Sequence, residues 1–426
     1  MKVALINPNW RFDGSIYFGC RSPHLPIEYG VSAQLLEDAG HSVRLIDGQM
    51  FDLSLADIAA EVRAFRADMA VITTAPSYLF WRCAPPELRV PQELAFHVRD
   101  LVPVLVAVGP HGSTTPRAAL RKLPVDMVVM GECEETLARI AGGERRNVPG
   151  TCYREGGEIR VVGGPQAARF VDQKPLAWSD EMIARHGHHH HRFDAEPKAP
   201  GAEVEASRGC PYHCTFCAKE NFRDDYRRRP ADGVLEEIFR LQAQGVEYVY
   251  FIDEIFLPNA PLLEGLIGRG LRFGVQTRID LWKPEMLELL GRSGCVSVEA
   301  GVESLSPEGR QALDKRCKLS TDELADRLTI AKSHIPFVQA NLIEMPHDED
   351  EQVQRWRDRM REAGVWANDP VPLFPYPGSP DYGRLWGLPD DTAWERAHEH
   401  YLAQFASFSD VQDERPRRLY ELERQP

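Results

Sequence analysis

Short apolar runs and longer amphipathic segments alternate along the first 145 residues of the chain. The apolar runs predict β-strands at 2–7, 42–47, 69–75, 102–109 and 125–131. Amphipathic patterns at 29–41 and 55–67 predict helices between them. This alternation is typical of a parallel α/β sheet, which binds ligands along the carboxyl ends of its strands. We therefore expect a binding edge made of the loops at 7–14, 47–48, 75–78 and 109–115.

A second alternating series begins at residue 202. It predicts strands at 246–253, 271–280, 296–304, 337–345 and near 371–377, with helices such as 231–245 and 321–334 between them. Six or so βα units within residues 202–390 favour a partial (βα)₆ barrel over a closed eight-stranded one.

The segments outside these two series have a different composition. Residues 146–201 predict a small hairpin turning at Gly156–Gly157, followed by a linker rich in Pro, Gly and His. Residues 391–426 predict a charged, helical tail. The fold class is therefore α/β, with a Rossmann-like domain at 1–145, a linker at 146–201 and a barrel at 202–390.

The composition limits the classes of molecule that the protein is expected to bind. The net charge of −14 argues against a nucleic acid or an anionic membrane and favours a small-molecule substrate. No leader pattern opens the chain, and no apolar run approaches the ~18 residues of a spanning helix, so we expect a cytoplasmic protein. Nine cysteines, an odd number, are scattered except for one trio, which indicates reduced thiols and a metal site.

The trio lies in SRGCPYHCTFCAKENF, where Cys210, Cys214 and Cys217 have C-x₃-C-x₂-C spacing. A compact loop with this spacing can direct three thiolates to one [4Fe–4S] cluster and leave the fourth iron open for a ligand. A structural zinc site normally needs a fourth Cys or His. His213 is a poor fourth donor because it lies between two ligands. The alternative is a zinc site, or three cysteines that bind no metal.

This loop, with Phe216 before the last cysteine, resembles the radical S-adenosylmethionine (SAM) superfamily. The resemblance implies that SAM chelates the open iron, and that an electron from a donor such as flavodoxin or ferredoxin cleaves SAM to a 5′-deoxyadenosyl radical. FPYPGSPDY resembles the late-barrel element of the family, whereas Glu344 and His347 replace glycines expected in its glycine-containing turn. By position in the motifs, the candidate SAM contacts are Asp253, Glu254, Arg278, Glu299 and Glu303.

The amino-terminal domain lacks a G-x-G-x-x-G motif after its first strand, which disfavours a dinucleotide site. LPIEYGVSAQLLEDAGHSVRLID, AVGPHGSTTPRAAL and MVVMGECEETL resemble the cobalamin-binding domain that precedes many radical SAM barrels. Small residues on its loops would let backbone N–H groups approach a bulky ligand. The matching positions are Thr74, Ser77, Gly109, Pro110, His111, Gly112, Ser113, Thr114, Gly131 and Glu132.

Two features of this domain and the linker leave alternatives open. The D-x-H-x-x-G motif of another cobalamin class is absent, so we expect no protein histidine on cobalt. A domain that has lost its cofactor and serves as packing or a lid is the alternative. In the linker, His189, His190 and His191 are candidate catalytic residues that could cover the active site, or a plain surface tract.

The resemblance as a whole implies a cobalamin-dependent radical SAM enzyme of the class B methyltransferase type, which methylates an unactivated carbon. In that family one SAM methylates reduced cobalamin, and a second SAM supplies the radical. A cyclisation or rearrangement without methylation is one alternative, and a non-catalytic iron–sulfur or cobalamin protein is the other.

Overall fold

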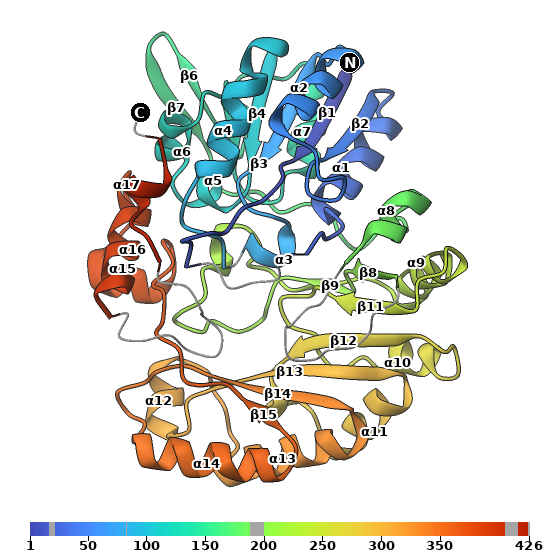
Figure 1. Ribbon diagram of the computed structural model, residues 1–426, viewed down its shortest axis with the longest axis vertical. Helices are drawn as coiled ribbons and strands as arrows, with labels where there is room; N and C mark the ends of the chain where they lie inside the picture. The colour runs from blue at the N-terminus through green and yellow to red at the C-terminus, as the bar shows by residue number, and fades with distance from the viewer. Residues whose placement is uncertain (17–21, 82, 188–199, 405–415, 425–426) are drawn as a thin grey trace.

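The computed structural model describes residues 1–426 except 17–21, 82, 188–199, 405–415 and 425–426. Two α/β units lie one above the other, and the carboxyl-terminal helices run alongside both (Figure 1). The upper unit contains a seven-stranded sheet and the lower unit a six-stranded sheet. The predicted alternation of strands and helices is therefore confirmed in both units.

The first sheet has the strand order β2-β1-β3-β4-β5-β6-β7, and its first five strands are parallel. The parallel strands are β1 (Lys2–Asn7), β2 (Ser42–Asp47), β3 (Met69–Thr73), β4 (Val104–Val108) and β5 (Met127–Val129). The order reverses between β1 and β3, and in an open α/β sheet such a reversal opens a ligand crevice at the carboxyl ends.

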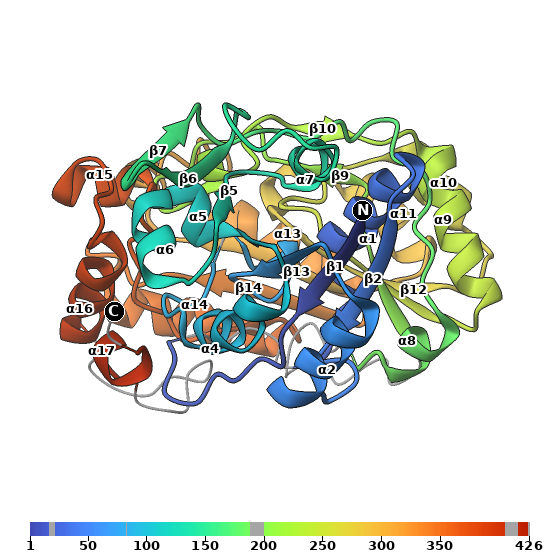
Figure 2. The same ribbon diagram turned by 90° about the horizontal axis from the view of Figure 1, so that it is seen from above.

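Helices cover both faces of this sheet (Figure 2). They are α1 (Ile27–Asp38), α2 (Leu55–Phe65), α3 (Tyr78–Trp81), α4 (Arg89–Val98), α5 (Pro110–Thr114), α6 (Pro116–Lys122) and α7 (Glu134–Ala141). Successive residues of β1 belong to different cores: Val3 packs with the α1 and α7 side and Ala4 with the α2 and α4 side. Because the strand is buried on both faces, its residues are apolar at successive positions, which explains the continuous apolar run in the sequence.

The hairpin predicted in the linker is formed by β6 (Thr151–Glu155) and β7 (Glu158–Val162), but it belongs to the first sheet. β6 pairs antiparallel with β5, in the register Val128↔Cys152. The first structural unit therefore extends to about residue 162 instead of ending at 145. The hairpin covers the β5 edge, which would otherwise expose unpaired backbone groups.

The second sheet is parallel throughout, with the order β15-β14-β13-β12-β11-β8. Its strands are β8 (Gly201–Val204), β11 (Tyr248–Phe251), β12 (Arg272–Thr277), β13 (Cys295–Glu303), β14 (Phe337–Leu342) and β15 (Trp366–Ala367). Its helices are α9 (Ala231–Ala243), α10 (Ala260–Leu266), α11 (Pro284–Arg292), α12 (Pro307–Ala312), α13 (Thr321–His334) and α14 (Asp350–Glu362). These six parallel strands agree with a partial (βα)₆ barrel.

The sixth strand lies earlier than predicted. β15 ends at Ala367, and within the predicted 371–377 segment Val371 makes an isolated bridge to Ile343. The reason is that four prolines lie between residues 370 and 377, and proline has no N–H to donate to a strand ladder.

The two faces of this second sheet differ in polarity. On β13, Val298, Ala300 and Val302 belong to the core shared with the surrounding helices, whereas Glu299 and Glu303 alternate with them. Because side chains alternate across a strand, the opposite face of the sheet carries polar groups. This face is the interior of the partial barrel.

The segment that connects the units contains α8 (Asp180–Arg185), and the chain ends with α15 (Pro380–Trp386), α16 (Ala393–Gln404) and α17 (Leu419–Leu422). The tail returns to the first unit, where Lys122 pairs with Glu423 at 2.9 Å and Trp394 donates to Thr115. No helix in the described ranges is long and apolar enough to cross a bilayer.

Candidate cofactor site at the cysteine loop

The three clustered cysteines lie on one loop between two short antiparallel strands, β9 (Ser207–Arg208) and β10 (Arg227–Arg228). Cys210, Cys214 and Cys217 are half-buried and form no disulfide with one another. The loop is folded tightly, since Cys217 N–H donates to the Cys214 carbonyl at 3.1 Å. Among the residues with defined positions, no three His, Cys, Asp or Glu side chains are grouped so as to hold one metal ion. In an iron–sulfur cube each thiolate binds a different iron, so three thiols on one loop are its natural donor set.

The start of the loop requires a glycine. Gly209 has φ +77°, and a Cβ atom there would lie 2.2 Å from the Asp225 carbonyl oxygen. Lys219 then fastens the loop, because its Nζ donates to the Cys210 carbonyl at 2.7 Å and to Asp224 Oδ1 at 2.6 Å. The backbone around the first cysteine is therefore fixed by contacts within the loop.

Asp253 and Glu254 follow β11 and hold the strand that leads into the cysteine loop. Asp253 is 2% exposed and accepts hydrogen bonds from Ala206 N at 2.9 Å and Ser207 Oγ at 2.5 Å. Burial raises the pKa of Asp253 to about 8. Glu254 accepts from Gly209 N at 2.7 Å. Both carboxyl groups thus contact the loop entrance, and a role for either in holding SAM stays a prediction.

Arg278 directly follows β12, beside the cysteine loop. Its guanidinium makes two hydrogen bonds to Asp280, at 3.1 and 2.7 Å, and lies 4.3 Å from the ring of Tyr212, which is located between Cys210 and Cys214. The residue is 6% exposed, and its Nη1 has no hydrogen-bond partner. A buried guanidinium with an unused N–H group next to the loop is suited to an anionic ligand.

The remaining predicted SAM contacts lie on β13. Glu299 is buried and aligned with Gln276 on β12 and Gln339 on β14. Glu303 forms an ion pair with Lys315 and has φ +64°, next to a register shift in the strand. A non-glycine residue in this conformation is strained, and such strain is concentrated at functional sites.

The predicted cobalamin loops meet at the carboxyl edge of the first sheet. Gly109 has φ +125°, and a Cβ atom there would lie 2.3 Å from Thr74 Oγ1, which is buried without a hydrogen-bond partner. Ser113 Oγ accepts from Gly131 N at 2.9 Å and thereby joins two of the loops. Gly112 packs closely on β5, since a Cβ atom there would lie 2.3 Å from Val128. Ser77 is buried in the neighbouring loop.

Two predicted cobalamin residues are engaged within the protein. His111 Nε2 lies 3.2 Å from the Pro86 carbonyl, and its ring lies 4.3 Å from that of Trp394. Burial lowers the pKa of His111 to about 3, so the imidazole is neutral. The Glu132 carboxylate pairs with arginines of the second unit, including Arg227 at 2.8 Å. Whether these two loops contact cobalamin stays a prediction, and His189, His190 and His191 lie outside the described residues.

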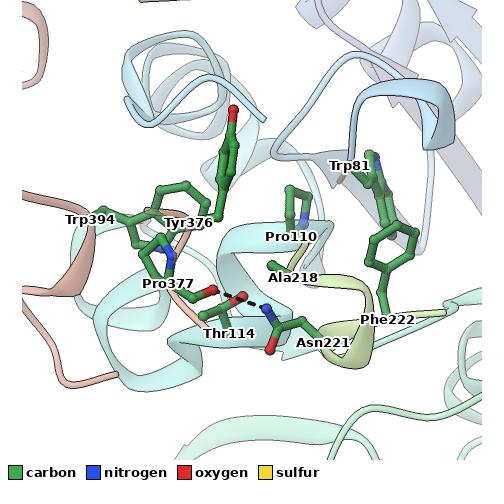
Figure 3. A pocket seen from close by; sticks show the side chains of 9 residues that line it. All are labelled: Trp81, Pro110, Thr114, Ala218, Asn221, Phe222, Tyr376, Pro377 and Trp394. Carbon is green, nitrogen blue, oxygen red and sulfur yellow. Dashed lines mark hydrogen bonds between the residues drawn. The ribbon is translucent and has the colours of Figure 1, made fainter. Parts of the chain in front are cut away.

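A small pocket lies between the α5 loop and the cysteine loop (Figure 3). It is lined by residues from both units and the tail: Trp81, Pro110, Thr114, Ala218, Asn221, Phe222, Tyr376, Pro377 and Trp394. Asn221 Nδ2 donates to the Pro377 carbonyl at 3.0 Å and so joins the cysteine loop to the late-barrel turn. The sequence reasoning missed the four aromatic residues, because they are dispersed over the whole chain.

Comparison with known proteins agrees with this geometry. The Radical SAM superfamily model matches residues 204–360. An uncharacterized methyltransferase of Pyrococcus horikoshii is 25% identical, over 91% of this chain and 82% of its own. The hopanoid C-3 methylase of Methylococcus capsulatus is 27% identical, over 89% and 71%. The anaerobic magnesium-protoporphyrin IX monomethyl ester cyclase of Cereibacter sphaeroides is 26% identical, over 77% of this chain and 54% of its own length.

Among solved structures, the radical SAM methyltransferase TsrM from Kitasatospora setae superimposes with a TM-score of 0.70, at 20% identity. The superposition covers 89% of this chain and 76% of that one, so the likeness in fold includes both units. The TsrM structure contains cobalamin and a [4Fe–4S] cluster. The cysteine loop and most of the barrel around it therefore form a radical SAM domain.

Proposed function

We propose that this chain is a cobalamin-dependent radical SAM enzyme that methylates an unactivated carbon of a small-molecule substrate. The observation that carries the proposal is the position of the cysteine loop, which meets the carboxyl edge of the first sheet across the pocket between Pro110 and Ala218. An iron–sulfur cluster and a cobalamin bound at these two places would face a common space. The methyltransferase relatives and TsrM support this pairing.

The residues present fit the cluster and SAM. Cys210, Cys214 and Cys217 supply three thiolates from one loop and leave one iron of a cube for a further ligand. The unpartnered Nη1 of Arg278 is suited to the carboxylate of SAM. Glu299 and Glu303, on the polar face of the barrel, are the proposed contacts to the rest of SAM.

The first unit fits cobalamin at its carboxyl edge. A Cβ atom at Gly109 would clash with Thr74, so the glycine lets these two loops meet, and Thr74 Oγ1 is buried there without a hydrogen-bond partner that a ligand could supply. We expect the backbone of 109–114 and Gly131 to contact the corrin. His111 Nε2 is held by the Pro86 carbonyl, whereas its Nδ1 is buried without a hydrogen-bond partner, so the expectation that no protein histidine binds cobalt rests on the absent D-x-H-x-x-G motif.

When bound, the cluster supplies the electron that cleaves SAM to a carbon radical, and cobalamin supplies a carrier for the methyl group. The chain itself binds and orients these groups and excludes water. Trp81, Phe222, Tyr376 and Trp394 give the pocket apolar walls, which would shield a radical from solvent. An external donor, such as flavodoxin or ferredoxin, would supply the electron.

Anaerobic reconstitution with iron, sulfide and hydroxocobalamin should yield about four irons and one cobalt per chain. With a reductant and SAM deuterated in its methyl group, the protein should form 5′-deoxyadenosine and transfer deuterium to the bound corrinoid. Mass spectrometry of the extracted corrinoid and nucleosides measures both. Failure to retain cobalt would contradict the cobalamin assignment and favour a first unit that acts only as packing or a lid.

A non-methylating reaction is the second candidate, because one of the relatives is a cyclase. The same experiment separates the two candidates. Formation of 5′-deoxyadenosine without label on the corrinoid, in a protein that retains cobalt, would favour the cyclisation or rearrangement.

Replacing Arg278 with glutamine should weaken SAM binding by 10-fold or more. A hydrogen bond to a charged group contributes roughly 1.5–3 kcal/mol, which corresponds to roughly 10- to 100-fold in affinity. Equilibrium dialysis of the reconstituted protein measures this. The matched control is Arg272→Gln, at the start of β12, where the side chain is half-buried and paired with Glu247 at 3.2 Å. An Arg278 variant that keeps its SAM affinity within twofold would remove this residue from the site.

A further inference from the structure

Two buried arginines lie at the two ends of the cysteine loop. Arg208 lies two residues before Cys210, and Arg223 lies six residues after Cys217. The side chains of both are 0% exposed. Any contact that fixes these two guanidinium groups therefore fixes both ends of the loop that carries the three thiols.

Arg208 binds carboxylates of both structural units. Its Nη1 lies 2.8 Å from Glu134 Oε1 and 3.2 Å from Glu132 Oε1, and both glutamates belong to the first unit, just after β5. Its Nη2 lies 2.7 Å from Glu205 Oε2 in the second unit. One guanidinium thus bridges the carboxyl edge of the first sheet and the start of the cysteine loop.

Arg223 shares two of these carboxylates. Its Nε lies 3.3 Å from Glu132, its Nη2 2.7 Å from Glu205, and its Nη1 2.8 Å from Glu254. Glu132 and Glu205 each pair with both arginines, so the two ends of the loop are joined through common partners. We call Arg208, Arg223, Glu132, Glu134, Glu205 and Glu254 the interdomain ion network.

Tyr78 adds a contact from another loop of the first unit. Its ring lies 3.9 Å from the Arg223 guanidinium and 5.1 Å from that of Arg208. Tyr78 is the first residue of α3, directly after the loop that carries Thr74 and Ser77. The arginines therefore contact two of the three loops proposed to hold cobalamin, one through Glu132 and one through Tyr78.

Stability alone is a poor explanation for such a network. Taking charges out of water is costly, and well-packed apolar residues often hold two surfaces together equally well. What a guanidinium adds is a planar, rigid fork that binds carboxylates in a defined geometry. This geometry matters when two reactive groups on different units must lie at a fixed separation, because small displacements slow a reaction strongly.

We propose that Arg208 and Arg223 are positioning residues that fix the separation between the cluster site and the cobalamin site. They act through Glu132 and Tyr78 on the first unit and through Glu205 and Glu254 on the second. The inference rests on the proposed function for its chemical meaning, whereas its mechanical part concerns this chain's residues alone.

The test uses Arg208→Lys and Arg223→Lys, which keep the charge but remove the fork, together with Glu132→Gln. The matched control is Arg229→Lys. Arg229 forms an equally buried pair with Glu237 at 2.7 Å and donates to the backbone carbonyl of Glu205 at 2.9 Å, and both of these partners belong to the second unit. Lysine keeps the positive charge, so these variants are expected to fold. Thermal unfolding of each protein checks this.

In the reconstituted protein, the readout is the magnetic interaction between cobalt(II) and the reduced cluster, measured by electron paramagnetic resonance. We expect Arg208→Lys and Arg223→Lys to change the strength of this magnetic coupling or to broaden its spectral signal. Deuterium transfer to the corrinoid should fall at least 10-fold relative to 5′-deoxyadenosine formation, while Arg229→Lys resembles the unaltered protein. Folded variants with unchanged magnetic interaction and an unchanged product ratio would overturn the proposal.

A second measurement needs no cofactor. Nitroxide labels on keto amino acids at Arg63 of α2 and Glu288 of α11, both exposed, report the distance between the units. We expect a narrow distance distribution that widens in Arg208→Lys and Glu132→Gln but not in Arg229→Lys. If the unaltered protein binds no cobalt, but the distance distribution still widens in Arg208→Lys and Glu132→Gln, the proposed function fails and the positioning role stands. Equal widths in all proteins overturn the positioning role itself.

Discussion

Replacing Cys210, Cys214 and Cys217 together with alanine should abolish both iron binding and reductive cleavage of SAM. The three thiols are the only cysteines that share a loop within the described residues, and the other described cysteines are dispersed over both units. Without them the described part of the chain has no second group of thiols to hold the cube, so iron should fall from about four per chain to background. Iron analysis, the visible spectrum and 5′-deoxyadenosine formation measure the loss.

The matched control is a triple variant of Cys83, Cys152 and Cys317, which removes the same number of thiols outside the loop. Cys83 and Cys317 are half-buried, like the cysteines of the loop, so the control also tests for adventitious iron on accessible thiols. We expect it to retain about four irons and normal SAM cleavage. A loop variant that keeps its iron, or a control that loses it, would contradict the assignment.

The patterns that were correct in the sequence are local. Val3 and Ala4 lie in a run that is buried on both faces, and such a run reads as a strand whatever it pairs with. The spacing of Cys210, Cys214 and Cys217 is likewise a property of one short loop. Local patterns of this kind determine which elements form and where the thiols are located.

What the sequence did not indicate depends on pairing across long distances. The hairpin of β6 and β7 was visible, but nothing in it specifies that β6 completes the first sheet. Trp394 reaches Thr115 from a tail to which the sequence assigned no role. Glu132 was assigned to cobalamin from its loop, whereas in the fold its carboxylate meets Arg208, 76 residues away. Charged partners so far apart carry no periodic signal.

Asp253 illustrates how the fold changes the meaning of a residue. The sequence offered Asp253 and Glu254 equally as SAM contacts, and an ionised carboxylate there would suit the SAM ammonium group. In the fold Asp253 is completely enclosed beneath β9, and burial raises its pKa from the ordinary 3.8 to about 8. Near neutral pH this carboxyl group is protonated and uncharged, so Glu254 is the better candidate for an ionic contact.

This protonation has a measurable consequence for stability. In the folded chain Asp253 keeps its proton up to about pH 8, whereas in the unfolded chain it loses the proton near pH 3.8. Between these values the folded state binds more protons, so the free energy of unfolding decreases as the pH rises. The slope is about 1.4 kcal/mol per pH unit, and the whole effect is on the order of 5 kcal/mol.

Asp253→Asn should remove this dependence. Asparagine can accept from Ala206 N through Oδ1 and donate to Ser207 Oγ, so both existing contacts have a counterpart. The variant should therefore gain stability relative to the unaltered protein as the pH rises from 5 to 8.5. Urea unfolding of both proteins in the same cofactor-free state measures the difference, from which contributions of other buried carboxyl groups cancel.

Asp47→Asn is the control that tests whether the pH range of the stability change follows the pKa of the replaced carboxyl group. Asp47 is also buried, accepts from Asn7 and Met50, and has a pKa raised by burial to about 6. Its difference curve should therefore level off near pH 6, whereas that of Asp253→Asn should continue to rise toward pH 8. A flat difference curve for Asp253→Asn would mean that the carboxyl group is ionised in the folded protein. It would then return to equal standing with Glu254 as a partner of the SAM ammonium group.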